Sequence, residues 1–433
     1  MFALLDANNF YVSCERRFNK TLEGKAVIVL SNNDGCAIAR SDEAKALGIK
    51  MGEPYFQIRE RFPHNEVISL SANFTLYGDM SARLMGEAEA LGHRQEIYSV
   101  DECFLDLSGI RGDLIRRGQI IRLRLQKRLG LPCGVGIGST KTLAKLASHV
   151  AKSAARKPGS YSADFANVCN LSALSESDLE AVMQATPVGD VWGIGRRIAA
   201  QLEALGIKTV LDAVRLDATT VRQRWSVVLE RTIRELQGQS CIELTNEFTP
   251  KKEIASTRSF GRTISTLPPM EQAVTNYIAR AAQKLRQQNG LASQVHVFCN
   301  TSPHSPKSAQ LYSSITIPLL RPTDSDLQLT KAALSGLRSI YKTGYNYTKA
   351  GVILIDILDK REPQQVCLGF HEEKPKSTAL MGVLDAINDR YGRGTLRLAS
   401  AGTQSQHRVW EMKQERKSPQ YTTNWKQIVI ARA

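Results

Sequence analysis

The sequence lacks the cysteine and histidine patterns of a structural metal site or a disulfide framework. Its eight cysteines include no C-x-x-C pair, and its seven histidines form no cluster with ligand spacing. No apolar run approaches the roughly 20 residues that span a membrane, and no basic leader precedes the first apolar run. These absences exclude a zinc-stabilised fold, a disulfide-rich secreted domain and a membrane protein. We therefore expect a cytoplasmic protein.

Acidic residues are in short supply overall, with 42 Asp and Glu against 57 Lys and Arg and a formal charge of +15. The shortage is uneven. Residues 1–120 carry 14 basic and 17 acidic side chains, whereas residues 121–433 carry 43 and 25. A strongly basic remainder suits a phosphate backbone as partner. The length predicts about two to four domains.

Two separated acidic sites point to the chemistry. Asp6 closes the apolar run at residues 2–5, and Asp101 and Glu102 lie inside the apolar stretch at residues 96–107. We interpret both as carboxylates held on strands, where an acid in apolar company should face a cleft, because burial without a cation is costly. Three converging carboxylates favour magnesium, and two such ions can stabilise the attacking and leaving oxygens of a phosphoryl transfer. The pattern predicts nucleotidyl transfer.

Any one of these acidic residues could instead be an ordinary carboxylate on a strand, with no catalytic role. Asp106 illustrates it, because it stands beside the Ser108-Gly109 turn and is left out of the site. Asp6 differs because Asn8-Asn9-Phe10-Tyr11 follows it directly, which puts two aromatics beside a strand-to-helix junction.

Periodicity divides the chain into segments. Residues 1–20 and 70–165 alternate strand-like and helical runs, which predicts an α/β core, and residues 21–69 form a small insert. The glycine-rich segment 134–138 is interpreted as a strand leading into a helix, since Lys141 comes too early for a P-loop. Residues 166–240 are predicted helical, and residues 247–358 a second α/β unit with four strands and two helices. Beyond residue 359 the chain is polar, with a helix predicted only at residues 378–391.

Two basic regions suggest contacts with DNA. The segment W-G-I-G-R-R at residues 192–197 has the pattern of a helix-hairpin-helix, in which glycines let the backbone approach a phosphate at the next helix start. The expected contacts there are Gly193, Gly195, Arg196 and Arg197, and a mere packing turn is the alternative. Around the first strand of the second α/β unit, Lys251, Lys252, Arg258 and Arg262 fit phosphate contacts, although a solvated basic edge would look the same.

Motifs in order along nearly the whole chain carry a family resemblance. They include D-A-N-N-F-Y-V-S-C at residues 6–14, S-V-D-E at 99–102 and G-V-G-I-G-S-T-K at 134–141, and they continue at 30–36, 43–48, 191–197, 258–261, 349–352 and 418–423. Through them the chain resembles the Y-family of translesion DNA polymerases, and most closely its UmuC branch. The resemblance implies a right-hand polymerase of mixed α/β and α+β domains. Its parts would be a palm (1–20 and 70–165), fingers (21–69), a helical thumb (166–240), a little finger (247–358) and a partner-binding tail (359–433).

The resemblance also implies roles at the site. Asp6, Asp101 and Glu102 would hold two Mg²⁺ ions, with the Ala7 carbonyl as a further ligand. The triphosphate contacts would be Lys45 and Lys152, with Arg40 a weaker candidate, and Asp42 stands where many relatives outside the branch have tyrosine. Tyr11 matches the steric gate against a ribose 2′-hydroxyl, and Phe10 is the alternative gate.

The implied partners are primer–template DNA, dNTPs, a dimer of cleaved UmuD-like subunits, RecA during the SOS response, and the sliding clamp. Clamp contacts fall on Gln365, Leu368 and Phe370, which resemble a clamp-docking peptide. Apolar tail residues suggest a docking surface, or else packing back on the little finger: Leu380, Leu384, Ile387, Trp410, Trp425, Ile428 and Ile430.

No second carboxylate cluster or spare domain suggests a proofreading nuclease, so the resemblance implies error-prone synthesis past lesions. A non-catalytic DNA-binding scaffold is an alternative, although all three metal carboxylates are present. A nucleotide cyclase with a similar palm is a third possibility, and it leaves the DNA-binding modules unexplained.

Overall fold

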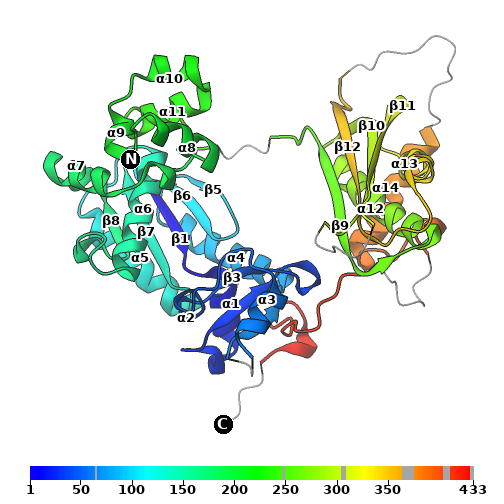
Figure 1. The fold of residues 1–433 in the computed structure, drawn as a ribbon, viewed down its shortest axis with the longest axis horizontal. Helices are drawn as coiled ribbons and strands as arrows, with labels where there is room; N and C mark the ends of the chain where they lie inside the picture. The colour runs from blue at the N-terminus through cyan, green and yellow to red at the C-terminus, as the bar shows by residue number, and fades with distance from the viewer. Residues whose placement is uncertain (64–65, 246–248, 304–308, 363–374, 403–409, 430–433) are drawn as a thin grey trace. The chain divides into compact units, whose positions relative to one another are not determined.

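The computed structural model of the chain describes residues 1–63, 66–245, 249–303, 309–362, 375–402 and 410–429 (Figure 1). The chain divides into two units. The first contains Met1–Ser31, Gly35–Glu247 and Arg416–Ala433, and the second contains Asn32–Asp34 and Phe248–Glu415. The end of the chain therefore returns to the unit in which the chain begins.

A five-stranded sheet with the order β5-β6-β1-β7-β8 forms the core of the first unit. Its strands are β1 (Phe2–Ala7), β5 (Gln95–Ile97), β6 (Glu102–Asp106), β7 (Cys133–Gly138) and β8 (Val168–Asn170). The apolar run of β1 is buried, and β1 pairs antiparallel with both β6 and β7. Four helices accompany this sheet: α1 (Phe10–Phe18), α4 (Phe74–Glu89), α5 (Leu114–Leu129) and α6 (Lys141–Arg156). This is the α/β core that the alternating pattern predicts.

The glycine-rich segment 134–138 lies in strand β7, as predicted. A Cβ atom at Gly136 would overlap the backbone of Ser148 in α6, and one at Gly138 would overlap that of Ala144. The glycines are therefore needed because α6 packs at backbone distance on the strand, which fixes where the lysines of α6 lie.

The insert at residues 21–69 is a small layer of its own. A three-stranded sheet with the order β3-β2-β4 carries two short helices. The elements are β2 (Val27–Leu30), β3 (Ala37–Arg40), β4 (Ile68–Ser71), α2 (Asp42–Ala46) and α3 (Tyr55–Arg61). Strand β2 pairs parallel with β4 and antiparallel with β3. The side chain of Ser41 accepts the backbone N–H of Ala44 and so starts α2 as a serine N-cap.

The predicted helical segment consists of α7 (Glu176–Ala185), α8 (Arg196–Ala204), α9 (Val210–Val214), α10 (Ala218–Arg224) and α11 (Val227–Leu236). Gly193 has a φ of 92°, a left-handed conformation that glycine adopts without strain. A Cβ there would also meet the hydroxyl of Thr232 in α11 at 2.7 Å. Gly195 then caps the start of α8. The glycine pattern therefore forms a tight turn between helices.

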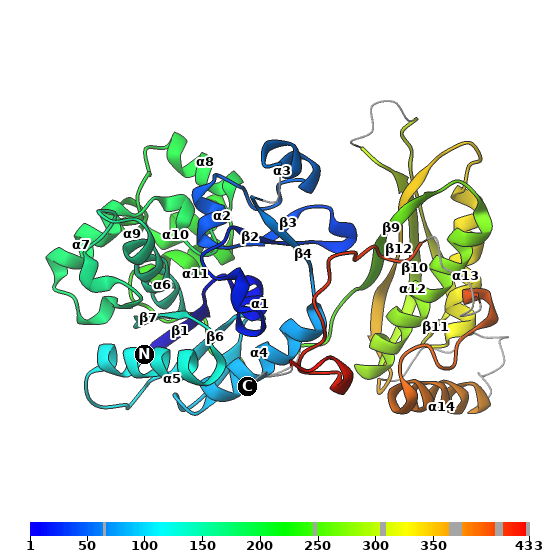
Figure 2. The same cartoon turned by 90° about the horizontal axis from the view of Figure 1, so that it is seen from below.

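The second unit is built on a four-stranded antiparallel sheet with the order β11-β10-β12-β9. The strands are β9 (Ile254–Ile264), β10 (Gly290–Thr301), β11 (Tyr312–Thr323) and β12 (Tyr347–Asp359). The helices α12 (Leu267–Gln287) and α13 (Asp326–Ile340) contact the sheet and each other. Figure 2 shows both helices running along the sheet. All four predicted strands and both predicted helices are present.

The tail divides between the two units. Helix α14 (Pro375–Tyr391) starts three residues before the predicted position. Of the apolar tail residues, Trp410 is buried against Tyr277 of α12, whereas Leu380, Trp425 and Ile428 are exposed. Packing back on the second unit is therefore observed for Trp410, and a docking surface stays a prediction for the exposed residues. Gln365, Leu368, Phe370 and Ile430 lie outside the described residues. No helix among those described is both long and apolar enough to cross a membrane.

Candidate active site

Strand pairing brings two of the predicted carboxylates together. Asp6 at the end of β1 is the direct register partner of Glu102 at the start of β6. The backbone N–H of Ala7 donates to the carbonyl oxygen of Asp101 at 2.9 Å, which joins the end of β1 to the residue just before β6. Asp6, Asp101 and Glu102 therefore lie at the same end of the inner strands β1 and β6, although 95 residues of sequence separate the first two.

The expectation that Asp101 lies on a strand is wrong. Residues 98–101 turn between β5 and β6, and the N–H groups of Tyr98 and Ser99 both donate to the carbonyl of Glu102 at 3.1 Å. The hydroxyl of Ser99 donates to the Asp101 carboxylate at 2.6 Å. These bonds close a hairpin, so strand alternation does not decide where Asp101 points.

Burial makes Asp6 difficult to ionise in the absence of a cation. Its exposed fraction is 5%, and this burial raises the pKa of the carboxyl to about 7, although Lys152 donates to it and opposes the shift. The neighbouring Glu102 adds to the increase. Burial acts in the same direction on Glu102, but the hydrogen bond with Asp6 and the charge of Lys145 outweigh it and lower the pKa of Glu102. The two neighbouring carboxyls therefore differ in pKa, because burial dominates at Asp6 whereas a hydrogen bond and a nearby ammonium dominate at Glu102.

A cavity of about 560 Å³ opens over these carboxylates. Every predicted catalytic and nucleotide-binding residue lines it: Asp6, Ala7, Phe10, Tyr11, Arg40, Lys45, Asp101, Glu102 and Lys152. The volume falls in the range of small-molecule sites. The strands, helices α1 and α6 and the insert all contribute, so the cavity combines carboxylates with cationic side chains.

The cationic side chains of the cavity are held by polar neighbours, and some of these neighbours were not among the residues predicted from the sequence. Lys45 donates to the side chains of Asn9 and of Asp42, the latter at 3.0 Å. Arg156, at the end of α6, lies 3.5 Å from the same Asp42 carboxylate. Arg40 donates to the carbonyl of Ile49 at 2.6 Å. Asn9 and Arg156 also line the cavity. The Asn8-Asn9 pair, which directly precedes the two aromatics, is the sequence pattern that could have identified Asn9 as a site residue.

The two gate candidates differ in burial. Phe10 has an exposed fraction of 3% and belongs to the core, whereas Tyr11 is half-buried. Tyr11 stacks on Tyr77 with ring centroids 4.4 Å apart and meets Phe74 edge to face. Both candidates line the cavity, but only Tyr11 combines access with a rigid aromatic support.

Lys145 is a functional candidate that sequence reasoning missed. Its ammonium lies 3.2 Å from the Glu102 carboxylate and 4.1 Å from the centre of the Tyr98 ring. The indole N–H of Trp192 donates to the hydroxyl of Tyr98 at 3.0 Å, so the hairpin segment of the helical region is tied to the turn that carries Asp101. Lys145 precedes Lys152 by seven residues in α6, two helical turns, and this spacing could have identified it.

The donor set suits a hard divalent cation, because it consists of carboxylate and carbonyl oxygens. Within the described part of the chain, no three His, Cys, Asp or Glu side chains are already gathered as a metal-binding group. Instead Asp6 is engaged by Lys152, Glu102 by Lys145 and Asp101 by Ser99. A divalent cation would take the place of the lysine contacts that Asp6 and Glu102 make in the free protein.

The predicted DNA contacts lie in separate places. Arg196 and Arg197 are exposed at the start of α8, beside Gly193 and Gly195. In the second unit, Lys251, Lys252 and Arg262 are exposed, whereas Arg258 is half-buried and shares the helix-covered face of β9 with Ile254 and Phe260.

Comparison with known proteins identifies the family. The impB/mucB/samB family matches residues 5–149, its C-terminal domain matches 251–368 and its helix-hairpin-helix motif matches 176–207, while a domain of unknown function matches 378–431. The chain is 44% identical over 432 residues to protein UmuC of Salmonella typhimurium, with 99% of each chain covered. It is 40% identical to protein MucB of Escherichia coli, over 100% of this chain and 99% of that one.

A solved structure shares the fold. A Y-family DNA polymerase chimera superposes with a TM-score of 0.63 at 18% identity, over 83% of this chain and all of the other. The match confirms the predicted arrangement of palm, fingers, thumb and little finger as a fold class. The scaffold and cyclase alternatives are set aside, because the family consists of DNA polymerases, which use divalent metal, DNA and dNTPs. The chain therefore belongs to the impB/mucB/samB family, the UmuC branch of the error-prone, translesion Y-family DNA polymerases.

Proposed function

We propose that Asp6, Asp101, Glu102 and the carbonyl of Ala7 hold two Mg²⁺ ions for DNA synthesis past damaged bases. The observation that carries the proposal is the register pairing of Asp6 with Glu102 at the floor of a cavity that also contains the cationic side chains. When bound, such ions activate the primer 3′-hydroxyl and neutralise charge on the triphosphate and the leaving pyrophosphate.

The cations of the cavity bind the triphosphate. Lys45 and Lys152 act as point charges, and Arg40 provides a planar fork for phosphate oxygens. In the free protein Lys152 pairs with Asp6 and Lys45 with Asn9 and Asp42. The same ammonium groups can turn to phosphate oxygens without leaving the cavity.

Tyr11 serves as the gate against ribonucleotides. Its ring is supported on Tyr77 and Phe74, so a clash with a ribose 2′-hydroxyl is not relieved by a simple rotation of the side chain. Phe10 lies behind it in the core and holds its position.

DNA is held outside the cavity by the glycine turn and the basic residues. Gly193, Gly195, Arg196 and Arg197 offer backbone N–H groups and charge to one phosphate stretch. The basic residues around β9 position the duplex without reading its sequence.

Full-length similarity to UmuC supports the proposed partners. These are a dimer of cleaved UmuD-like subunits, RecA in the SOS response and the sliding clamp. The cytoplasm is the compartment in which such substrates and partners meet.

Primer extension tests the proposal. Purified full-length protein with its partners, clamp and Mg²⁺ should extend a primer past a lesion, and Asp101→Asn should abolish extension while duplex DNA binding persists. Asp106→Asn is the matched control, since the Asp106 carboxylate accepts the local N–H of Ser108 at 2.9 Å and does not line the cavity. Full activity in Asp101→Asn would refute the metal assignment.

A further inference from the structure

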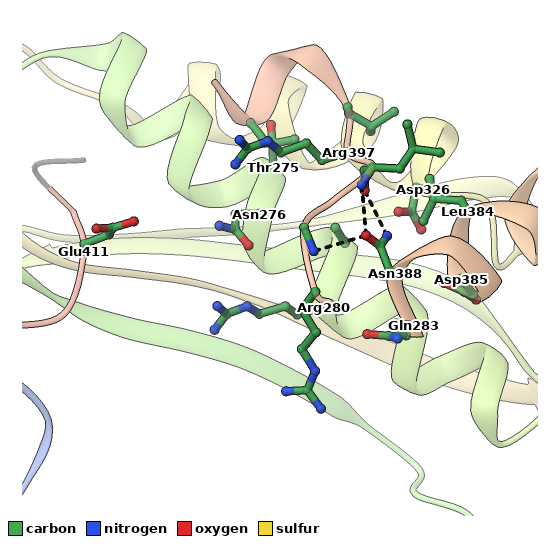
Figure 3. Close-up of a pocket in the computed structure, with 16 residues that line it drawn as sticks. Thr275, Asn276, Arg280, Gln283, Asp326, Leu384, Asp385, Asn388, Arg397 and Glu411 are labelled. Carbon is green, nitrogen blue, oxygen red and sulfur yellow. Dashed lines mark hydrogen bonds between the residues drawn. The ribbon is translucent and has the colours of Figure 1, made fainter. Parts of the chain in front are cut away.

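Two further cavities differ in how their charges balance. The larger, of about 560 Å³, lies in the second unit between α12, α14 and the segment that follows α14 (Figure 3). Its wall holds three arginines beside the three carboxylates of Asp326, Asp385 and Glu411, so its charges are balanced. The smaller, of about 320 Å³, lies in the first unit at the start of α5. Among the described residues, three arginines and one carboxylate line this second cavity, which we call the α5 pocket.

The one carboxylate of the α5 pocket is engaged by the helix itself. Asp113 caps α5 by accepting two backbone N–H groups of its first turn, at 2.8 and 3.1 Å. The side chains of Arg111 and Arg116 form no ion pair or hydrogen bond with any residue that the structure describes. Arg117 donates to the carbonyl of Leu91 at 3.1 Å, and its Nε has no partner in the described chain. The pocket therefore presents guanidinium donors that lack a counter-charge.

Helix α5 continues the positive charge of the pocket along its length. Its 16 residues include six Arg and Lys and no Asp or Glu. Arg124 and Arg128 both pair with Glu87 at 2.8 Å. Arg116 and Lys127, by contrast, are exposed and have no ion pair within the described part of the chain. The unpaired cations of the helix are therefore those that face solvent.

Two large apolar side chains lie between these unpaired cations. Ile120 and Leu123 have exposed fractions of 56% and 69%. With Arg116 and Lys127 they follow an i, i+4, i+7, i+11 spacing, which places all four on one side of an α-helix. We call these four residues the α5 stripe. Ile120 also lines the α5 pocket, so the pocket and the stripe form one continuous surface.

The α5 stripe belongs to a helix on the opposite face of the sheet from α6. A Cβ atom at Gly118 of α5 would meet Val135 of β7, whereas one at the adjacent Gly136 would meet α6. Adjacent residues of a strand point to opposite faces, so α5 and α6 cover different faces. Helix α6 supplies the lysine that contacts Asp6. Of the described residues that line the cavity over Asp6, none comes from α5, so a molecule bound to the stripe leaves that cavity open.

We propose that the α5 pocket and the α5 stripe form a docking surface for an acidic segment of another protein, one that carries apolar side chains between its carboxylates. Carboxylates match guanidinium groups such as those of Arg111 and Arg116 in two-pronged hydrogen bonds. Apolar side chains of the segment would cover Ile120 and Leu123, which a monomer leaves in water.

Charge and apolar surface together select this occupant. A nucleic-acid backbone would satisfy the cations but would leave the apolar centre of the stripe uncovered. A second copy of this chain docked through the same face would bring the cations of the two stripes together, and like charges across an interface oppose association. An acidic segment with apolar side chains satisfies both parts of the surface.

Fluorescence anisotropy with a defined probe tests the surface. The full-length protein is first saturated with a hairpin primer–template, which occupies the proposed DNA contacts. The probe is a fluorescein-labelled synthetic helical peptide with glutamates and leucines at i, i+4 and i+7 spacing, and it carries benzoylphenylalanine for photocrosslinking. We expect saturable binding, with crosslinks within residues 111–127. Poly-glutamate should bind more weakly, because it offers charge without apolar side chains.

Two variants separate the apolar and the charged parts of the stripe. Leu123→Gln should weaken peptide binding by roughly tenfold, as expected when an apolar contact of leucine size is lost. The double variant Arg116→Gln/Lys127→Gln should weaken it by roughly fivefold and reduce its salt dependence, because exposed charge pairs each contribute little. Arg128→Gln is the matched control, since Arg128 lies in the same helix but pairs with Glu87, so peptide binding should be unchanged. Leu123 is largely exposed, so Leu123→Gln tests the surface even where the double variant misfolds.

Four results would overturn the proposal. The first is an absence of saturable peptide binding, or crosslinks confined to other residues. The second is equal binding of poly-glutamate and the peptide with no effect of Leu123→Gln, which would indicate a general anion surface. The third is binding of oligothymidine in place of the peptide, lost in the double variant, which would indicate a nucleic-acid site. The fourth is a concentration-dependent dimer in sedimentation that Leu123→Gln abolishes. Extension of the hairpin primer is measured in parallel and reports the polymerase function separately.

Discussion

The C-terminal strap, residues 416–421, should detach when Asn73 is replaced. The amide of Asn73 is fully buried and donates to the Ser418 carbonyl, the Ser418 hydroxyl and the Pro419 carbonyl at 3.0–3.1 Å. The Ser418 hydroxyl in turn donates to Glu15 at 2.9 Å, and Tyr421 stacks on Phe18 with ring centroids 4.9 Å apart. One short side chain thus holds the middle of a segment that lies about 345 residues away in the sequence.

The expected effect of Asn73→Ala follows from the bonds it removes. The Asn73 amide nitrogen has only two N–H groups, so its three contacts amount to about two hydrogen bonds. At about 1 kcal/mol net for each bond, their loss weakens strap docking by about 2 kcal/mol, or roughly 30-fold in the docking equilibrium. Asn73 also caps α4 by accepting the N–H of Leu76 at 3.4 Å, and the loss of that cap adds about 1 kcal/mol to the destabilisation of the helix.

Native-state hydrogen exchange measures the docking equilibrium directly. The backbone N–H of Arg416 donates to the hydroxyl of Ser71 at 3.0 Å and is the reporter. Its exchange should accelerate by roughly 30-fold in Asn73→Ala. Asn424→Ala is the control, because the side chain of Asn424 accepts the N–H of nearby Lys426. Equal exchange rates in wild type and Asn73→Ala, or an equal acceleration in the control, would refute the argument.

Three further predictions concern the first unit. Glu102→Gln should lower primer extension by on the order of a thousandfold, as expected when a metal-binding charge worth several kcal/mol is lost, and calorimetry should show weaker Mg²⁺ binding; intact Mg²⁺ binding would contradict this. Tyr11→Ala should raise the ratio of ribonucleotide to deoxyribonucleotide incorporation in single-nucleotide assays, and an unchanged ratio would move the gate to Phe10. Burial raises the pKa of Glu15 despite hydrogen bonds from Tyr77 and Ser418, so the folded protein keeps this proton to higher pH than the unfolded chain does. Its contribution to stability is therefore greatest below the unfolded pKa and falls as pH rises through the folded one, and thermal melts of Glu15→Gln should show a flatter pH dependence than wild type.

Much of the candidate active site could be predicted from the sequence because its signals are local. Asp6 follows an apolar run and precedes two aromatics within five residues, and Asp101 and Glu102 are adjacent. Such short patterns fix which side chains enter a cleft once the strand or helix forms. Helix and strand positions in both units also follow from periodicity and glycine stops.

The features that escaped prediction depend on residues far apart in the chain. Lys145 pairs with Glu102 only because β7 glycines let α6 approach the sheet. Hydrogen bonds of the Ser99 hydroxyl with the side chain and the backbone N–H of Asp101 close the turn that holds Asp101. These local bonds favour a turn over an extended strand.

The sequence by itself determined the family, the three candidate metal-binding carboxylates, the basic character of residues 121–433 and the type of most secondary-structure elements. Each of these depends on residue identity and on short spacings along the chain. Only the tertiary structure decided that Asp6 faces Glu102, that the strap at residues 416–421 returns to Asn73, and that arginines of α12 and of the segment after α14 line one cavity. The reason is physical: short-range patterns fix local backbone conformation, whereas packing and hydrogen bonding across hundreds of residues choose which surfaces meet.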